Sequence, residues 1–128
     1  VNACTDVTGF GILGHLLEMV RASNVSAELM ADKVPLIKGV MEYYQAGTVP
    51  GGTLQNLSYA EPSIRWSDGT TESTKTILAD AQTSGGLLIS TPNDTARKLL
   101  EEIREGGSPE ASIIGRILPV SDFLIKIN

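Results

Sequence analysis

The apolar residues in the first part of the chain follow the period of a helix and then alternate as in a strand. Two apolar rows run through residues 8–23, one made of Phe10, Leu13, Leu17 and Val20 and the other of Ile12, Leu16 and Met19. They predict a helix that packs on more than one side, with Thr8 as its N-cap and Asn24 as its stop signal. Residues 25–29 alternate instead, which predicts a half-buried strand.

Weaker patterns predict the elements of the remaining chain. In chain order they are a helix from Pro35 to Gly47, a helix at 73–78, a strand at 86–91, a helix from Asn93 or Asp94 to Gly106, a strand at 113–118 and an edge-type strand at 123–127. The apolar run Leu87-Leu88-Ile89 is unbroken, so we expect that strand to be buried on both faces. Residues 48–73 lack periodicity and predict a functional or disordered loop with one short helical piece near 54–59.

This order of helices and strands predicts an α+β domain. One mixed sheet of about four strands with helices packed on it is the simplest architecture that covers the apolar faces.

Composition narrows the classes of function. The 128 residues suffice for a single domain with one core, and the chain starts at Val1 within a continuing pattern, so we expect a piece of a longer protein. A net charge of −5 without a basic stretch argues against nucleic acid and anionic membranes as partners. No apolar run approaches a membrane span. The single cysteine excludes an internal disulfide and fits a reducing compartment, which predicts the cytoplasm.

A glycine pattern opens the first predicted helix. Gly9-Phe10-Gly11-Ile12-Leu13-Gly14 matches the dinucleotide-binding pattern, and Glu28 follows at about the usual offset of roughly 20 residues. A dinucleotide site needs a buried apolar strand before the first glycine, but polar residues stand there, including Asp6. The better interpretation is a helix whose glycines allow close packing.

Two polar turns carry the candidate chemistry. Asp6 precedes the first helix, where a carboxylate can serve the helix dipole or ligate Mg²⁺, a hard cation that takes oxygen ligands. One aspartate cannot hold Mg²⁺ alone, so further ligands would come from phosphates, water or another domain. The second turn, Thr83-Ser84-Gly85-Gly86, offers hydroxyl and backbone N–H groups to an anion, or its hydroxyls bond their own backbone.

The single cysteine and the single histidine carry weaker signals. Cys4 has no histidine near it in the sequence, which predicts a structural or incidental role. His15 lies on the more polar face of the first helix, so we expect a solvated surface residue. One histidine and one cysteine do not make the usual zinc site.

Two stretches together resemble a known family. Thr5-Asp6-Val7-Thr8-Gly9-Phe10-Gly11-Ile12-Leu13-Gly14-His15 and Asp80-Ala81-Gln82-Thr83-Ser84-Gly85-Gly86-Leu87-Leu88 are similar to motifs in the C-terminal domain of the selenophosphate synthetases, also called selenide, water dikinases. Pro50-Gly51-Gly52-Thr53 with Asn56 resembles the central loop of that family. The resemblance covers nearly the whole chain. One departure is Ala81, where many members have proline; it removes no chemical group.

The resemblance implies a fold and an activity. The fold would be a three-layer α/β/α domain of the aminoimidazole ribonucleotide synthetase group, with residues 1–128 as the C-terminal half of a two-domain enzyme. The family makes selenophosphate from selenide, ATP and water with release of AMP and orthophosphate, requires Mg²⁺ and works as a homodimer. The catalytic Cys or selenocysteine and its partner Lys would lie in the N-terminal domain, so we expect this chain alone to be inactive.

The resemblance also implies roles for individual residues. Asp6 would be a Mg²⁺ ligand that completes a site whose other aspartates lie in the N-terminal domain, and Cys4 is not the catalytic cysteine. Thr5, Thr83 and Ser84 are candidate substrate-binding residues. Two alternatives stay open: another ATP-dependent enzyme of the aminoimidazole ribonucleotide synthetase group, and a non-catalytic binding module with the same fold.

Overall fold

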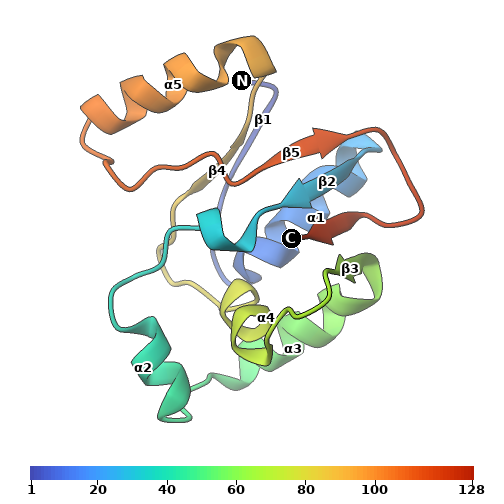
Figure 1. Ribbon diagram of the computed structural model, residues 1–128, viewed down its shortest axis with the longest axis vertical. Helices are drawn as coiled ribbons and strands as arrows, with labels where there is room; N and C mark the ends of the chain where they lie inside the picture. The colour runs from blue at the N-terminus through green and yellow to red at the C-terminus, as the bar shows by residue number, and fades with distance from the viewer.

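Six strands form two separate sheets in the computed structural model, which describes residues 1–128 (Figure 1). The strands are β1 (Ala3–Asp6), β2 (Ser26–Leu29), β3 (Ile64–Trp66), β4 (Leu87–Ser90), β5 (Gly115–Leu118) and β6 (Ile125–Ile127). The helices are α1 (Gly11–Ser23), α2 (Val40–Gln45), α3 (Gly51–Ala60), α4 (Glu72–Leu78) and α5 (Asn93–Glu105), with short 3₁₀ turns at Ala31–Lys33 and Glu61–Ser63. The predicted α+β class is confirmed.

The larger sheet is mixed and has the strand order β3-β6-β2-β5. β6 runs parallel to both of its neighbours, and β5 runs antiparallel to β2. The mixed four-stranded sheet is therefore confirmed, but the prediction of an edge strand at 123–127 is wrong because β6 is interior. Ile125 and Ile127 are fully buried while Lys126 is half-buried. Their alternation reports a sheet covered on one face, and it carries no information on position within the sheet.

The smaller sheet is a two-stranded antiparallel ribbon of β1 and β4. β1 was not predicted, because its residues are mostly polar and too few to show alternation. The prediction that Leu87-Leu88-Ile89 is buried on both faces is wrong: Leu87 is 67% exposed, whereas Leu88 is 8% exposed. Only one face of the ribbon packs on the core, so successive side chains along β4 alternate between protein and solvent.

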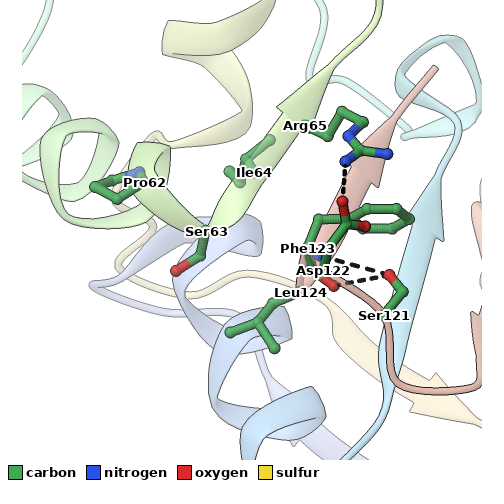
Figure 2. Close-up of a pocket in the computed structure, with 8 residues that line it drawn as sticks. All are labelled: Pro62, Ser63, Ile64, Arg65, Ser121, Asp122, Phe123 and Leu124. Carbon is green, nitrogen blue, oxygen red and sulfur yellow. Dashed lines mark hydrogen bonds and ion pairs between the residues drawn. The ribbon is translucent and has the colours of Figure 1, made fainter.

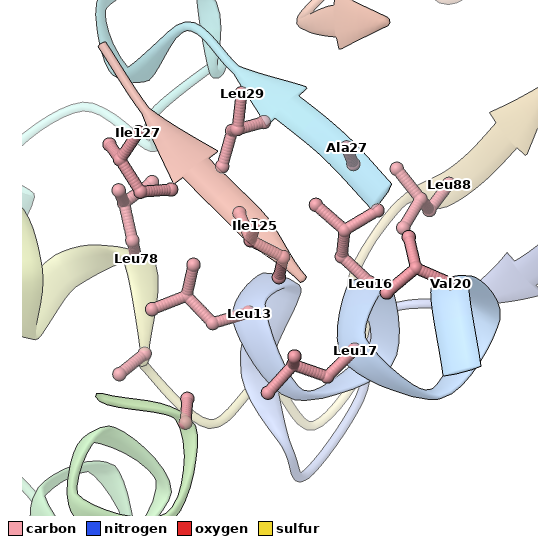
Figure 3. Close-up of a cluster of buried hydrophobic side chains, with 12 residues drawn as sticks. Leu13, Leu16, Leu17, Val20, Ala27, Leu29, Leu78, Leu88, Ile125 and Ile127 are labelled. Carbon is pink, nitrogen blue, oxygen red and sulfur yellow. The ribbon is translucent and has the colours of Figure 1, made fainter. Parts of the chain in front are cut away.

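The core lies between α1 and the larger sheet. Both predicted rows of α1 contribute, because Leu13, Leu17 and Val20 are fully buried and Leu16 nearly so. Figure 3 shows these side chains pointing toward Ala27 and Leu29 of β2 and toward Ile125 and Ile127 of β6, with Leu78 and Leu88 at the margins. The helix ends as predicted, with Asn24 in the left-handed conformation at φ 52°.

The start of α1 differs from the prediction. Phe10 occupies the N-cap position without a side-chain bond, and the helix begins at Gly11 rather than directly after Thr8. The Thr8 hydroxyl is hydrogen-bonded to Nε2 of His15 at 3.1 Å, so it does not cap the helix. A tertiary contact has replaced the local one that the sequence favours.

The stretch 48–73 is mostly regular structure, so its prediction as a loop is wrong, whereas the short helical piece predicted near 54–59 lies within α3. α3 fills residues 51–60, a 3₁₀ turn and β3 follow, and α4 begins at Glu72. Pro50 stands in the extended conformation just before α3, where the missing N–H of proline costs nothing. The glycines after it hide the helical period because they add no apolar side chain.

The remaining helices agree with the predictions in place and differ in detail. α2 is shorter than the predicted helix from Pro35 to Gly47, and α4 matches within a residue. α5 starts at Asn93 with Pro92 as its N-cap, and none of its residues is fully buried. Figure 1 shows α5 at the top of the view, beside the N-terminus. No helix combines the length and the apolar character needed to cross a membrane.

The position of the core gives a first prediction. Leu17→Ala should lower the free energy of unfolding by about 2–5 kcal/mol, because it removes a fully buried side chain between α1 and the sheet. Leu54→Ala on α3 is the matched control, since Leu54 is 52% exposed and its truncation should cost little. Urea unfolding of both variants measures the difference, and equal losses would contradict this description of the core.

Candidate functional site

The two motifs that carried the predicted chemistry lie side by side. Asp6 pairs with Leu87 at the end of the ribbon, and the N–H of Val7 donates to the carbonyl of Gly86 at 2.8 Å. The N–H of Gln82 then donates to the carbonyl of Thr8 at 3.0 Å. The pairing of β1 with β4 therefore continues past the strands and joins the segment 7–11 to the turn 80–86.

Asp6 is exposed on the outer face of the ribbon. No hydrogen bond or ion pair within the chain uses its carboxylate oxygens, so they are free to bind a cation. Three or more His, Cys, Asp or Glu side chains do not gather anywhere in the chain as a metal-binding group. The role of Asp6 as one ligand of a site completed by other groups therefore stays a prediction.

Thr5 lies on the opposite face of the ribbon from Asp6. Its strand partner is the buried Leu88, and its hydroxyl donates to the carbonyl of Asp6 at 3.2 Å. The structure therefore does not bring the side chains of Thr5 and Asp6 to one surface. Thr5 can influence the site only through its hydrogen bond to the backbone carbonyl of Asp6, at the end of β1.

Thr83 and Ser84 are exposed at the tip of the second turn. Neither hydroxyl is bonded within the chain, so the alternative in which they bond their own backbone is not what the structure has. Gly85 is required for a different reason: a Cβ there would lie 2.1 Å from the carbonyl oxygen of Val7. The turn is pressed against the end of β1 and presents two free hydroxyl groups outward.

Asp80 is the first residue of this turn, and both oxygens of its carboxylate accept hydrogen bonds from side chains of the chain. Oδ1 accepts a hydrogen bond from the Thr53 hydroxyl at 2.7 Å, and Oδ2 accepts one from the side-chain amide of Gln82 at 2.8 Å. The sequence analysis gave Asp80 no role, although the motif contains it. Because both oxygens are in use, Asp80 shapes the turn and is a poor candidate for a metal ligand.

The glycine pattern at residues 9–14 serves packing. Gly11 adopts φ +66°, and a Cβ there would lie 2.7 Å from the carbonyl oxygens of Ala79 and Asp80. A dinucleotide fold would need β1 and β2 as parallel neighbours in one sheet, whereas they belong to different sheets. The dinucleotide alternative is therefore wrong, and the interpretation as close packing is confirmed for Gly11, whereas a Cβ at Gly9 would meet nothing within 4 Å.

Glu28 would bind the ribose in that alternative, but its carboxylate is already bonded to other side chains of the chain. The Arg116 guanidinium, the Asn128 amide and the Lys126 ammonium all contact its carboxylate, which is 12% exposed. The hydrogen bond from Arg116 holds the pKa of Glu28 below its usual range, against the opposing effect of desolvation. Glu28 is a structural anchor on the larger sheet.

His15 is buried, so its prediction as a solvated surface residue is wrong. It is 7% exposed, with Nε2 bonded to Thr8 and Nδ1 bonded to Glu18, each at 3.1 Å. Phe10 covers the ring at a centroid distance of 5.6 Å. The polar helix face that suggested exposure is covered by the folded-back segment 8–10. Cys4 is exposed and free, and its structural or incidental role stays a prediction.

The surface has several hollows, and two of them differ in their relation to the predicted site residues. The smaller, about 480 Å³, is lined by the eight residues in Figure 2. Its charges are satisfied internally, because Arg65 pairs with Asp122 at 2.6 Å and stacks 4.6 Å over Phe123. The larger, about 1650 Å³, runs along the turn 80–86, the segment 34–40 and the apolar side of α5. Thr83 and Ser84 line the larger hollow, and no predicted site residue lines the smaller one.

Comparison with known proteins identifies the family of this chain. The chain belongs to the family described as AIR synthase related protein, C-terminal domain, whose model matches residues 1–126. The resemblance inferred from the two motifs is thus confirmed at the level of the family.

Relatives that match nearly the whole chain carry one name. Proteins named selenide, water dikinase are 41% identical over 99% of this chain in Clostridioides difficile (strain 630), 45% over 91% in Myxococcus xanthus (strain DK1622) and 38% over 100% in Aliarcobacter butzleri (strain RM4018). The matches cover 36%, 33% and 37% of those proteins. The chain therefore spans about a third of the length of these relatives.

The packing role of Gly11 can be tested directly. Gly11→Ala should destabilise the chain by about 2 kcal/mol or more, because it combines a left-handed conformation with a steric clash. Gly9→Ala is the matched control, since a Cβ at Gly9 meets nothing within 4 Å. Denaturant unfolding compares the two. A loss at Gly9 as large as that at Gly11 would show that the contact with Ala79 is not the reason for the glycine.

The cluster around Glu28 gives a pH prediction. A carboxyl group whose pKa is lower in the folded state stabilises above the unfolded pKa, and the contribution is lost as pH falls through the folded pKa. Between about pH 5 and about pH 3 the melting temperature of the native chain should therefore fall more steeply than that of Glu28→Gln. Thermal melts at several pH values measure this, and parallel curves would contradict it.

Proposed function

We propose that this chain is the C-terminal domain of a selenophosphate synthetase, which makes selenophosphate from selenide, ATP and water and releases AMP and orthophosphate. The observation that carries the proposal is the name selenide, water dikinase on relatives that match 91–100% of the chain. The free carboxylate of Asp6 lies beside a turn with free hydroxyls, and this arrangement supports the proposal. A carboxylate can ligate the Mg²⁺ that accompanies a phosphate-bearing substrate, and hydroxyl groups can donate hydrogen bonds to the phosphate.

Asp6 would supply one oxygen ligand to Mg²⁺. The carboxylate fits that role because it is exposed and has no partner within the chain. When bound, Mg²⁺ neutralises the charge that develops on phosphate oxygens during phosphoryl transfer. The remaining ligands would come from phosphate groups, water and an N-terminal domain of the same protein.

Thr83 and Ser84 would contact the phosphate groups from the other turn. Their hydroxyls are free, and the turn 80–86 lies against the segment that bears Asp6. Thr5 would act by supporting the end of β1, since its hydroxyl bonds the Asp6 carbonyl. The full-length protein would work as a cytoplasmic homodimer.

A second candidate is another ATP-dependent enzyme of the aminoimidazole ribonucleotide synthetase group. The family match at residues 1–126 favours it as much as it favours a dikinase. The two differ in substrate, so assay of the full-length protein for AMP release with and without selenide separates them. A non-catalytic module would release AMP in neither assay.

The proposed role of Asp6 predicts an opposite response of stability and activity. Asp6→Asn should leave the melting temperature of this chain unchanged or slightly higher, because no partner is lost. The full-length enzyme should lose most of its turnover, with partial recovery at high Mg²⁺, because asparagine keeps one oxygen ligand but gives up the negative charge. Thermal melting and Mg²⁺ titration of AMP release measure the two effects.

Asp68→Asn is the matched control, since Asp68 is an exposed aspartate on the turn between β3 and α4. Its activity and Mg²⁺ dependence should equal those of the native enzyme, and the 128-residue chain alone should release no AMP. Normal turnover of Asp6→Asn with an unchanged Mg²⁺ dependence would return Asp6 to a helix-dipole role.

A further inference from the structure

Helix α3 contacts both segments of the candidate site through one side chain. α3 packs against α1 and α4 (Figure 1), and Asn56 is one of its residues. Its side-chain amide donates to the carbonyl of Gly9 at 2.8 Å and to the carbonyl of Ala79 at 3.1 Å. One amide therefore bridges the segment that follows Asp6 and the segment that leads into the turn 80–86.

A second side chain of α3 fixes the beginning of that turn. Thr53 is 1% exposed, and its hydroxyl donates to Oδ1 of Asp80 at 2.7 Å. The hydroxyl oxygen of Thr53 also accepts a hydrogen bond from the backbone N–H of Ala81 at 3.4 Å. Gln82 then bonds the other oxygen of Asp80. The hydroxyl thus serves as both donor and acceptor at one buried point, which no apolar side chain of the same shape can do.

The backbone contact that α3 supports leaves little room for adjustment. Gly11 and Gly85 each face a carbonyl oxygen at a distance that excludes a Cβ. A shift of the turn relative to β1 would break the Asn56 bridge and the Gln82 to Thr8 hydrogen bond together. Two residues of α3 that touch neither Asp6 nor the hydroxyls of Thr83 and Ser84 therefore support their separation, in addition to the pairing of β1 with β4.

We propose that Thr53 and Asn56 are positioning residues, which hold the Asp6 strand end and the turn 80–86 at the spacing that one Mg²⁺-bound polyphosphate requires. The inference rests on the proposed function of these two segments. A metal ligand and a phosphate-contacting turn act on the same group only if their separation is kept, and a misplacement of about 1 Å can cost roughly a hundredfold in rate.

The test uses the full-length enzyme with paired substitutions. Thr53→Val keeps the shape and removes the hydroxyl, whereas Thr53→Ser keeps the hydroxyl. Asn56→Ala removes the bridge, and Gln55→Ala on the exposed side of the same helix is its control. Thr53→Val and Asn56→Ala should raise the Mg²⁺ concentration for half-maximal activity and lower kcat by about 10- to 100-fold. Thr53→Ser and Gln55→Ala should stay within about threefold of the native enzyme.

Hydrogen exchange gives a readout that does not depend on activity. In Thr53→Val and Asn56→Ala the amides of Val7, Ala81 and Gln82 should exchange faster, while those of α1 and β6 keep their native rates. If Thr53→Val fails to fold, Asn56→Ala decides, because Asn56 is only half-buried.

The outcomes separate the two proposals. A native full-length protein that releases no AMP from ATP and selenide overturns the proposed function, and the exchange rates then still test the positioning of the turn. An active native enzyme whose Thr53→Val and Asn56→Ala variants keep native kcat and Mg²⁺ dependence overturns the positioning role. Equal loss in Thr53→Val and Thr53→Ser also overturns it, because the hydroxyl would then not be the group that matters.

Discussion

The close backbone contact between the segment 7–11 and the residues 79–86 is the constraint on which the candidate site depends. Two glycines permit it: Gly11 faces the carbonyl groups of Ala79 and Asp80, and Gly85 faces that of Val7. The ribbon of β1 and β4 ends in this contact, and α1 begins from it. Because these two positions carry no side chain, the end of β1 that bears Asp6 can lie directly against the turn that carries Thr83 and Ser84.

The sequence predicted the parts of the fold that rest on long apolar patterns. The two rows of α1 and the end at Asn24 report burial that persists over several residues, so they survive in the structure. β2 lies where the alternation predicts a strand, but it is not half-buried, because Ser26 is fully buried and the Glu28 side chain is 12% exposed. The site motifs were also found, because Asp6 and the turn 80–86 stand out as polar stretches next to apolar ones. Family resemblance then gave them a chemical meaning that spacing alone did not.

The failures share one physical cause, which is that tertiary contacts replaced local ones. Thr8 bonds His15 instead of capping α1, and His15 is buried by that same contact. α3 was predicted only as a short piece near 54–59, because its buried residues are Thr53 and Ala60, which no hydrophobic pattern marks. Asp80 and Asn56 act on partners 27 and 23 residues away, at Thr53 and Ala79. Separations of this kind leave no periodic signal in the sequence.

The interior place of β6 has a consequence for how the chain is made. β2 is made about a hundred residues before its parallel partner β6, as the Glu28 to Lys126 separation of 98 residues shows. Until residues 125–127 leave the ribosome, α1 has no complete sheet to pack on, and the apolar face of β2 stays open. The core between α1 and the larger sheet therefore closes only after β6 has been made, and β6 closes it from the interior of the sheet.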